Sequence, residues 1–362
     1  MLAVSNPLPV LKFFASYCTA RPGKKQQRSG DSEAVTAMSI ACGVDIGSNS
    51  FRLLVAEVEA GHLHPLAHEL VTVRLGEGLG GTGLLASAPM RRGEAALVRF
   101  AEKIAAYPVD SLRACATHAV RNAANRDEFL QRAGVLAGFR IEVLSGEEEA
   151  RLALLGALSA LPQEQRRYPM MLADVGGGSS ELILQALAGS EPRAISLPLG
   201  AVGLIEEFGA DLEAMRRKIR AVLVPALWRI AEGEMVRKGS LLVASGGTAT
   251  SLAALSLGLA RYDARQVQNY TLSQARLDNL LARLVALSPE ERKGLPALAD
   301  GRGEIIVAGT VILQELRQAL AIPALLVSDA GLLEGILLSG AAGSSTGRRS
   351  SGGGCVSLQT RH

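Results

Sequence analysis

Acidic side chains flank a run of glycines in residues 171–187, M-L-A-D-V-G-G-G-S-S-E-L-I-L-Q-A-L. The glycines at 176–178 can adopt backbone angles closed to other residues and carry no Cβ atom, so their amide groups can converge on an anion. Asp174 precedes them and Glu181 follows them. Carboxylates on both sides of a phosphate-binding turn make chemical sense when a cation lies between them and the phosphate. The stretch therefore indicates a phosphate and metal site, although a glycine-rich hairpin with acidic flanks would show the same pattern.

A second copy of this motif lies in residues 44–56, V-D-I-G-S-N-S-F-R-L-L-V-A. Aligned with residues 173–185, the copy pairs Asp45 with Asp174, Gly47 with Gly176, Ser50 with Ser179, Arg52 with Glu181 and Leu53 with Leu182. A repeat of this kind indicates that one structural unit occurs twice. We therefore expect two similar lobes, with the site in the cleft between an acid-rich hairpin and a more basic one.

The elements that would position these hairpins alternate between short apolar runs and amphipathic stretches, which is typical of strands followed by helices. In the first half we expect strands over 40–45, 51–57, 63–75, 112–116 and 140–144, and helices over 89–107, 126–137 and 146–161. In the second half we expect a hairpin over 169–187, strands 193–197, 241–244 and 324–328, and helices over 203–231, 248–260, 273–287, 304–320 and 330–339. The fold class is therefore α/β.

The two ends of the chain differ from this α/β body in composition. Residues 1–37 carry a short apolar stretch followed by basic residues, the reverse of a secretory signal, and Met38 is a plausible start. Glycine and serine runs from about residue 343 are typical of a disordered tail. We predict disordered tails over 1–37 and 341–362, a first lobe over 38–165 and a second lobe over 166–340.

Composition excludes several classes of protein. The 362 residues have a net charge of +3, too small for a surface that coats a polyanion such as DNA. Aromatic residues make up only 4%, so base-stacking platforms are not expected. The four cysteines are scattered, as in a reduced cytoplasmic protein, and no apolar run approaches the ~20 residues of a membrane helix.

Five motifs occur in the order D-I-G-S-N-S-F-R-L-L-V, A-T-H-A-V-R-N-A-A-N-R, S-G-E-E-E-A-R-L, D-V-G-G-G-S-S-E and S-G-G-T. Together they resemble the exopolyphosphatase / guanosine pentaphosphate phosphohydrolase (Ppx/GppA) family over about residues 40–340, in a short form without the C-terminal HD-type domain. The resemblance implies two ribonuclease-H-like lobes, as in actin, sugar kinases and Hsp70 ATPases, with a cleft between them. It also implies Mg²⁺-dependent hydrolysis of the terminal phosphoanhydride of polyphosphate or pppGpp, and it leaves room for K⁺ as a stimulating ion and for a homodimer.

The resemblance assigns a catalytic set of Glu149, Glu181 and Arg121. Glu149 occupies the position of the family's catalytic glutamate and would act as a general base on the attacking water. Arg121 resembles the family's phosphate-binding arginine. Acidic residues in the first turn of a helix are also common without any catalytic role, and His118, two residues after Ala116, is interpreted as a substitution for a small hydroxyl residue.

The same resemblance extends to the phosphate and metal ligands. Phosphate is expected to bind Ser48, Asn49, Ser50 and Arg52 in the first hairpin, Gly176, Gly177, Gly178 and Ser179 in the second, and Gly246, Gly247 and Thr248 at the start of a helix. Mg²⁺ is expected to bind Asp174, Glu181 and Asp45. The hydroxyl residues of the first hairpin would also suit a turn without any ligand.

Two positions depart from the family pattern, because Gly203 and Leu333 stand where many members carry arginine. Without these two basic groups, weaker binding of long polyphosphate chains is expected. Three histidines, His62, His64 and His68, lie beside no cluster of cysteines or acids and are interpreted as surface residues. Two other functions fit the same motifs: a non-catalytic sensor of (p)ppGpp or polyphosphate, and a kinase of the same superfamily, which would need an acceptor pocket.

Overall fold

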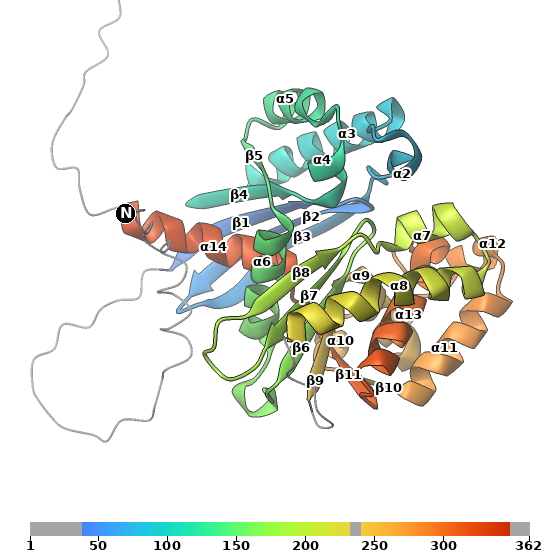
Figure 1. Ribbon diagram of the computed structural model, residues 1–362. Coiled ribbons are helices and arrows are strands. Elements are labelled where there is room, and N and C mark those ends of the chain that lie inside the picture. The colour runs from blue at the N-terminus through green and yellow to red at the C-terminus, as the bar shows by residue number, and fades with distance from the viewer. Residues whose placement is uncertain (1–37, 232–239, 348–362) are drawn as a thin grey trace, which may run out of the picture.

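The computed structural model describes residues 38–231 and 240–347 of the chain. Within them, the strands form two sheets, which Figure 1 shows one above the other with helices α6 (Gly146–Ala160) and α14 (Leu332–Gly347) between them. The tail expected over residues 1–37, and the part of the expected C-terminal tail from residue 348 onward, lie outside the described residues.

The first sheet has the strand order β3-β2-β1-β4-β5. Its strands are β1 (Ser39–Ile46), β2 (Ser50–Glu59), β3 (His62–Thr72), β4 (Ser111–Ala116) and β5 (Ile141–Val143). The helices of this half are α2 (Leu79–Thr82), α3 (Ser87–Ile104), α4 (His118–Asn122) and α5 (Arg126–Ala137). The central strand β1 is an almost unbroken apolar run because helices cover both of its faces, as is typical of parallel and mixed sheets.

The second sheet has the order β10-β11-β9-β6-β7-β8. Its strands are β6 (Met170–Val175), β7 (Ser180–Gln185), β8 (Arg193–Leu197), β9 (Leu241–Ser245), β10 (Thr271–Ser273) and β11 (Ala324–Val327). The helices of this half are α7 (Ala201–Phe208), α8 (Leu212–Ala231), α9 (Gly246–Leu257), α10 (Ala264–Val267), α11 (Gln274–Ala286), α12 (Pro289–Lys293) and α13 (Arg302–Ala319), and a 3₁₀ turn spans Gln163–Gln165.

The two sheets repeat one topology. In the first, β1 pairs antiparallel with β2, β2 with β3, and β4 and β5 follow in parallel. In the second, β6, β7, β8, β9 and β11 take the same positions in the same order, with β10 added at the edge. The prediction of a duplicated α/β unit with two ribonuclease-H-like lobes is confirmed.

Helices α6 and α14 are exchanged between the two sheets. Helix α6 belongs to the first half of the sequence, but it packs in one core cluster with β6 and β7 of the second sheet. Helix α14 ends the described chain, but its Leu333 and Leu337 pack against Ala41 and Leu54 of the first sheet. The predicted lobe boundary at residue 165 follows the order of the sequence, so it assigns α6 to the first lobe and α14 to the second. In the structure each of these helices packs on the sheet of the other lobe.

Helix α14 also corrects the expected start of the C-terminal tail. The helix continues to Gly347, whereas the tail was expected from residue 341. Small residues such as Gly340 and Ala341 suit this position because the helix crosses β1 and β4 at close range. At Gly340 and Ala341, small residues therefore accompany close packing of the helix on the sheet.

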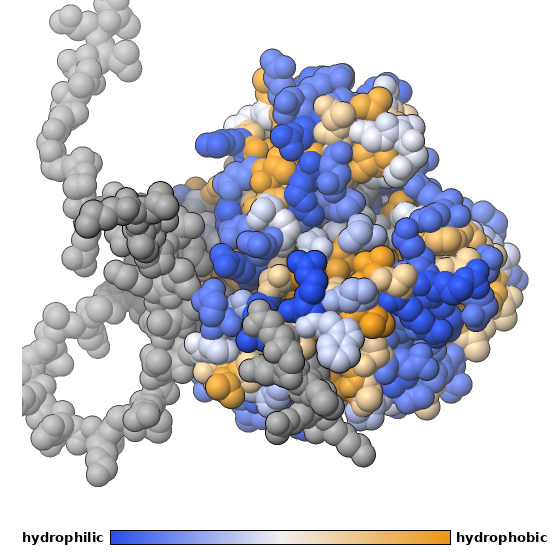
Figure 2. Space-filling view, in the orientation of Figure 1, coloured by the Kyte–Doolittle hydropathy of each residue, from blue (hydrophilic) through white to orange (hydrophobic). Residues whose placement is uncertain are grey.

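Apolar residues fill a separate core in each lobe. The face shown in Figure 2 is mostly hydrophilic, with apolar residues in small groups. Among the described residues, no helix combines the length and the hydropathy that crossing a bilayer requires.

Candidate active site

A cavity of about 80 Å³ lies between the lobes, at the turns that close the two repeated hairpins. Its lining comes from both turns and the strand ends beside them, and from the starts of α4, α6, α9, α13 and α14. Of the residues expected to act in the site, those that line this cavity are Asp45, Ser48, Asn49, Ser50, Arg52, Glu149, Asp174, Gly176, Gly177, Gly178, Ser179, Glu181, Gly246 and Gly247. The structure thus brings together residues more than 200 positions apart in the sequence.

The two turns have the same backbone geometry. The Gly47 amide donates to the Ser50 carbonyl at 3.2 Å, and the Gly176 amide donates to the Ser179 carbonyl at 2.9 Å. The turns also touch each other, because a Cβ atom on Gly178 would lie 2.4 Å from Ser48 Oγ. Only glycine permits this approach, so the cavity is narrow where the lobes meet.

Four carboxylates converge on the cavity: Asp45, Glu149, Asp174 and Glu181 are all buried. Burial raises the pKa of Asp174, and burial together with the charges of Glu149 and Asp174 raises the pKa of Glu181 well above its usual value. Carboxylates crowded in this way repel one another in the charged state. The cavity is therefore built to receive positive charge.

Part of that positive charge comes from Arg52, which pairs with Asp45 across the strands β1 and β2. Its Nε and Nη2 donate to Asp45 Oδ2 at 2.9 and 2.7 Å. Burial alone would lower the pKa of this guanidinium, but the carboxylates of Asp45 and Asp174 outweigh burial, so the pKa is raised. The other oxygen of Asp45, Oδ1, is buried without a hydrogen-bond partner.

Glu149 opens helix α6, whose N-terminus is capped by the Ser145 side chain, which accepts from the Glu148 amide at 3.1 Å. Its carboxylate Oε2 accepts from Arg121 Nη1 at 2.7 Å, and the same nitrogen donates to the Leu144 carbonyl at 2.9 Å. Burial raises the pKa of Glu149 to about 7, although Arg121 opposes the shift. A general base is most effective with a pKa near the working pH.

Arg121 was expected to bind phosphate, but the structure places it behind Glu149, outside the cavity lining. The reason is that helix α4 turns its side chain toward the end of β5, where the Leu144 carbonyl and Glu149 satisfy it. In the structure Arg121 therefore holds the Glu149 carboxylate in place.

We expect the substitution Arg121→Gln to move the acidic limb of the pH–rate profile upward. The guanidinium lowers the pKa of Glu149, so its removal leaves the carboxyl protonated to a higher pH, by about one pH unit or more. The measurement is kcat/KM for phosphate release as a function of pH. Arg121→Lys keeps the charge and should keep the limb near that of the wild type; an unmoved limb in Arg121→Gln would remove the link between this arginine and the base.

Arg302, at the start of α13, is a cavity residue that none of the sequence motifs contains. Its guanidinium is so close to the first turn of α9 that a Cβ atom on Gly247 would lie 2.0 Å from Nη2. Burial, and then the charge of Arg52, lower its pKa to about 10, so it still carries a positive charge at neutral pH. A single arginine between two glycines gives no periodic or motif signal, which is why the sequence did not reveal it.

Thr117 and His118 also line the cavity, at the start of α4. Burial and the charge of Arg121 lower the pKa of His118 to about 4, so its ring is neutral at physiological pH. Thr248, by contrast, was expected to bind phosphate but is absent from the lining: it is buried under α13, where a Cβ atom on Gly309 would lie 2.2 Å from its Oγ1.

The departures from the family pattern fall in different places. Leu333 is buried in the core between α14 and the first sheet, away from the cavity. Gly203 lies on α7 and faces a larger cleft that opens from the cavity. His62 and His64 are exposed on β3, and no group of three metal-binding side chains occurs in residues 38–231 and 240–347.

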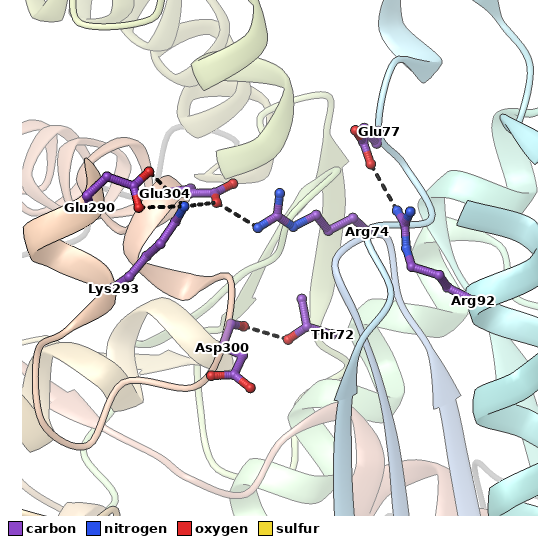
Figure 3. Close-up of polar contacts among 8 residues, drawn as sticks. All are labelled: Thr72, Arg74, Glu77, Arg92, Glu290, Lys293, Asp300 and Glu304. Carbon is purple, nitrogen blue, oxygen red and sulfur yellow. Dashed lines mark hydrogen bonds and ion pairs between the residues drawn. The ribbon is translucent and has the colours of Figure 1, made fainter. Parts of the chain in front are cut away.

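Polar contacts hold the lobes together beside the cavity, as Figure 3 shows. Arg74 of the first lobe pairs with Glu304 of α13 at 2.7 Å, and Lys293 approaches the same carboxylate at 3.3 Å. Thr72 Oγ1 donates to the Asp300 carbonyl at 2.6 Å. Because Arg302 stands between Asp300 and Glu304 in the sequence, these contacts fix the segment that brings its guanidinium to the cavity.

Comparisons with known proteins agree with this arrangement. A model of the Ppx/GppA phosphatase family matches residues 54–342. Exopolyphosphatase 2 of Mycobacterium tuberculosis is 32% identical to this chain over 326 residues, which cover 84% of this chain and 99% of the relative.

Solved structures give the same result. An exopolyphosphatase-like protein superposes with a TM-score of 0.76 at 28% identity, over 83% of this chain and 97% of that one. The Aquifex aeolicus member of the Ppx/GppA family superposes with a TM-score of 0.69 at 28% identity, over 85% and 99% of the two chains. An exopolyphosphatase from Cytophaga hutchinsonii gives 0.75 at 26% identity, over 83% and 97%. The chain belongs to the Ppx/GppA phosphatase family.

Proposed function

We propose that the chain hydrolyses the terminal phosphoanhydride of inorganic polyphosphate or of a related compound such as pppGpp, and releases orthophosphate. The observation that carries the proposal is the position of Glu149, a buried carboxylate with a raised pKa, in a cavity bounded by the two repeated turns. The likeness to the exopolyphosphatase of Mycobacterium tuberculosis supports the substrate class.

The arrangement suits in-line attack by water. In this proposal, Glu149 accepts a proton from the attacking water, and the terminal phosphate lies against the turn amides with Ser48 and Ser179. Arg302 and Arg52 then neutralise negative charge on the phosphate oxygens. Phosphoryl transfer needs little covalent help from the protein, so one base and good charge neutralisation are sufficient.

Mg²⁺ is part of the proposal because the donor set suits it. Asp45 has a buried oxygen with no hydrogen-bond partner, and Asp174 lies beside the start of α9, where a Cβ atom on Gly246 would be 2.4 Å from its Oδ1. Mg²⁺ is usually held by one or two carboxylates together with phosphate oxygens and water, so a preformed group of three ligands is not required. When bound, the ion would neutralise phosphate charge. Glu181, whose pKa is strongly raised and which accepts from Ser196 Oγ at 2.8 Å, fits this role less well than Asp174.

We expect Asp174→Asn to raise the Mg²⁺ concentration needed for half-maximal phosphate release by about tenfold or more. The amide keeps the shape of the side chain but has no charge to attract the ion. The measurement is phosphate release against Mg²⁺ concentration at saturating substrate. Asp211→Asn, which retains the N-terminal cap of α8, is the matched control. An unchanged requirement in Asp174→Asn would place the ion elsewhere.

The experiment that tests the function follows phosphate release from polyphosphate, pppGpp and ATP with the purified chain. Release from polyphosphate or pppGpp supports the proposal. Binding without release would instead indicate a sensor, and transfer of the terminal phosphoryl group from ATP to an added acceptor alcohol, with no release of orthophosphate, would indicate a kinase.

A further inference from the structure

A second, larger space opens from the catalytic cavity. This outer cleft has a volume of about 870 Å³ and lies between the loop around α2 and helix α7. It shares four lining residues with the catalytic cavity, Ser48, His118, Gly177 and Gly178, so the two spaces are continuous. A substrate whose terminal phosphate occupies the cavity would extend its remaining phosphates through the outer cleft.

The charge of the outer cleft is opposite to what a polyphosphate chain requires. Among the described residues that line it, Glu77, Glu206 and Glu207 are acidic and Lys218 is the single basic residue. His118 adds no charge, because its pKa is lowered to about 4. The lining therefore carries two more negative charges than positive ones at neutral pH.

The few neighbouring cations compensate this charge only in part. Lys218 Nζ lies 3.9 Å from Glu207, and Arg92, outside the lining, pairs with Glu77 at 2.9 Å. Glu206 accepts a hydrogen bond from the Gly78 amide at 3.0 Å, which holds its carboxylate across the cleft between the lobes. Within the described part of the chain, no lysine or arginine pairs with Glu206, so its charge faces the cleft.

Gly203 lines the same cleft and lies on helix α7, as Glu206 and Glu207 do. A Cβ atom at this position would meet nothing within 4 Å, and the residue lies in helix α7 with an ordinary helical φ. A side chain would therefore meet no clash at its Cβ atom, and it would extend from the wall of an open cleft. The absence of a basic group at this position is a property of the sequence and is not imposed by the packing.

We infer that the outer cleft makes this enzyme selective for short oligophosphates, with Glu206 and Glu207 as the residues that reject long chains and no basic group at Gly203 to offset them. The inference rests on the proposed function. Arg302 and Arg52 attract the terminal phosphate into the cavity, but each further phosphate of a long chain adds a negative charge beside the glutamates. A tail of one or two phosphates avoids most of this repulsion.

The test compares binding of tripolyphosphate and of long-chain polyphosphate by calorimetry, at equal concentrations of chain ends and fixed Mg²⁺, in the Glu149→Gln background, where the ligands should bind without turnover. With the outer cleft unchanged, tripolyphosphate should bind about tenfold more tightly, and added KCl should strengthen binding of the long chain, because salt screens repulsion. Gly203→Arg and the double substitution E206Q/E207Q should reduce the preference by about the same factor. The side-chain amide introduced by E206Q would still accept a hydrogen bond from the Gly78 amide, and Gly203→Ala controls for the altered helix.

Each outcome has a separate meaning. A long chain that binds as tightly as tripolyphosphate, or whose binding weakens with salt as in an attractive site, overturns the selectivity but leaves the proposed function intact. An unchanged preference in both the arginine and the glutamine variants removes these residues as its cause. If neither phosphate binds, the proposed function fails, and the selectivity fails with it.

Discussion

Phosphate release by the Glu149→Gln variant should fall by about 10²- to 10⁴-fold, the range lost when a general base is removed. The amide can still accept a hydrogen bond from Arg121, which in the wild type donates to Oε2 at 2.7 Å, so the local structure should be retained. The amide cannot, however, take a proton from the attacking water. The measurement is the rate of orthophosphate release with polyphosphate at saturating concentration, together with the affinity for tripolyphosphate, which should change little.

Glu148→Gln is the matched control for this variant. Glu148 precedes the base on the same helical turn, but its carboxylate points away from the cavity and lies 3.6 Å from Arg113. Its charge should therefore matter little to turnover. Glu149→Gln with wild-type activity, or an equal loss in Glu148→Gln, would assign the proton transfer to another group.

The Gly156→Ala variant should be destabilised by about 1–3 kcal/mol or more, the usual cost of overpacking a core. A Cβ atom on Gly156 would lie 1.8 Å from the Gly331 carbonyl oxygen, and one on Gly335 would lie 1.9 Å from the Leu152 carbonyl oxygen. The helices α6 and α14 thus cross at a distance that only glycine permits. Without such contacts, alanine in a helix would stabilise the chain, so the expected sign depends on the crossing.

Gly134→Ala provides the comparison, because this glycine also lies within a helix, α5, and its Cβ atom would meet only the Phe139 carbonyl at 3.5 Å. We expect thermal unfolding of Gly134→Ala at or slightly above the wild-type temperature and unfolding of Gly156→Ala well below it. Equal melting temperatures in the two variants would show that the helix crossing adjusts without cost.

The parts of the fold that were predicted from the sequence are those that depend on local pattern. The repeated hairpins were found because glycine, aspartate and serine recur at the same spacing, and the register of each hairpin places Asp45 opposite Arg52 and Asp174 opposite Glu181. The exchange of α6 and α14 was missed because an amphipathic helix shows that it has an apolar face, but not which sheet that face covers.

In the candidate site too, the residue types were predicted from local motifs, but the packing of their side chains was not. Glu149 was found through its motif, and the structure brings it into the cavity. The partner of Arg121 could not be read from the sequence, because its contact with Glu149 joins residues 28 positions apart. Thr248 follows two glycines that do line the cavity, but the helix that begins there turns its side chain inward. The types of residue in a site are local information, whereas the direction of each side chain depends on packing.

The exchange of α6 and α14 has a consequence for the growing polypeptide on the ribosome. The first sheet begins at Ser39, but the helix that covers one of its faces starts at Leu332, after all the strands of the second sheet. Until that helix emerges, Ala41 and Leu54 lack their contacts with Leu333 and Leu337, so the nascent first lobe exposes apolar surface while the second lobe is made. A fragment cut after residue 165 should therefore aggregate, and the two halves should depend on each other to reach the native state.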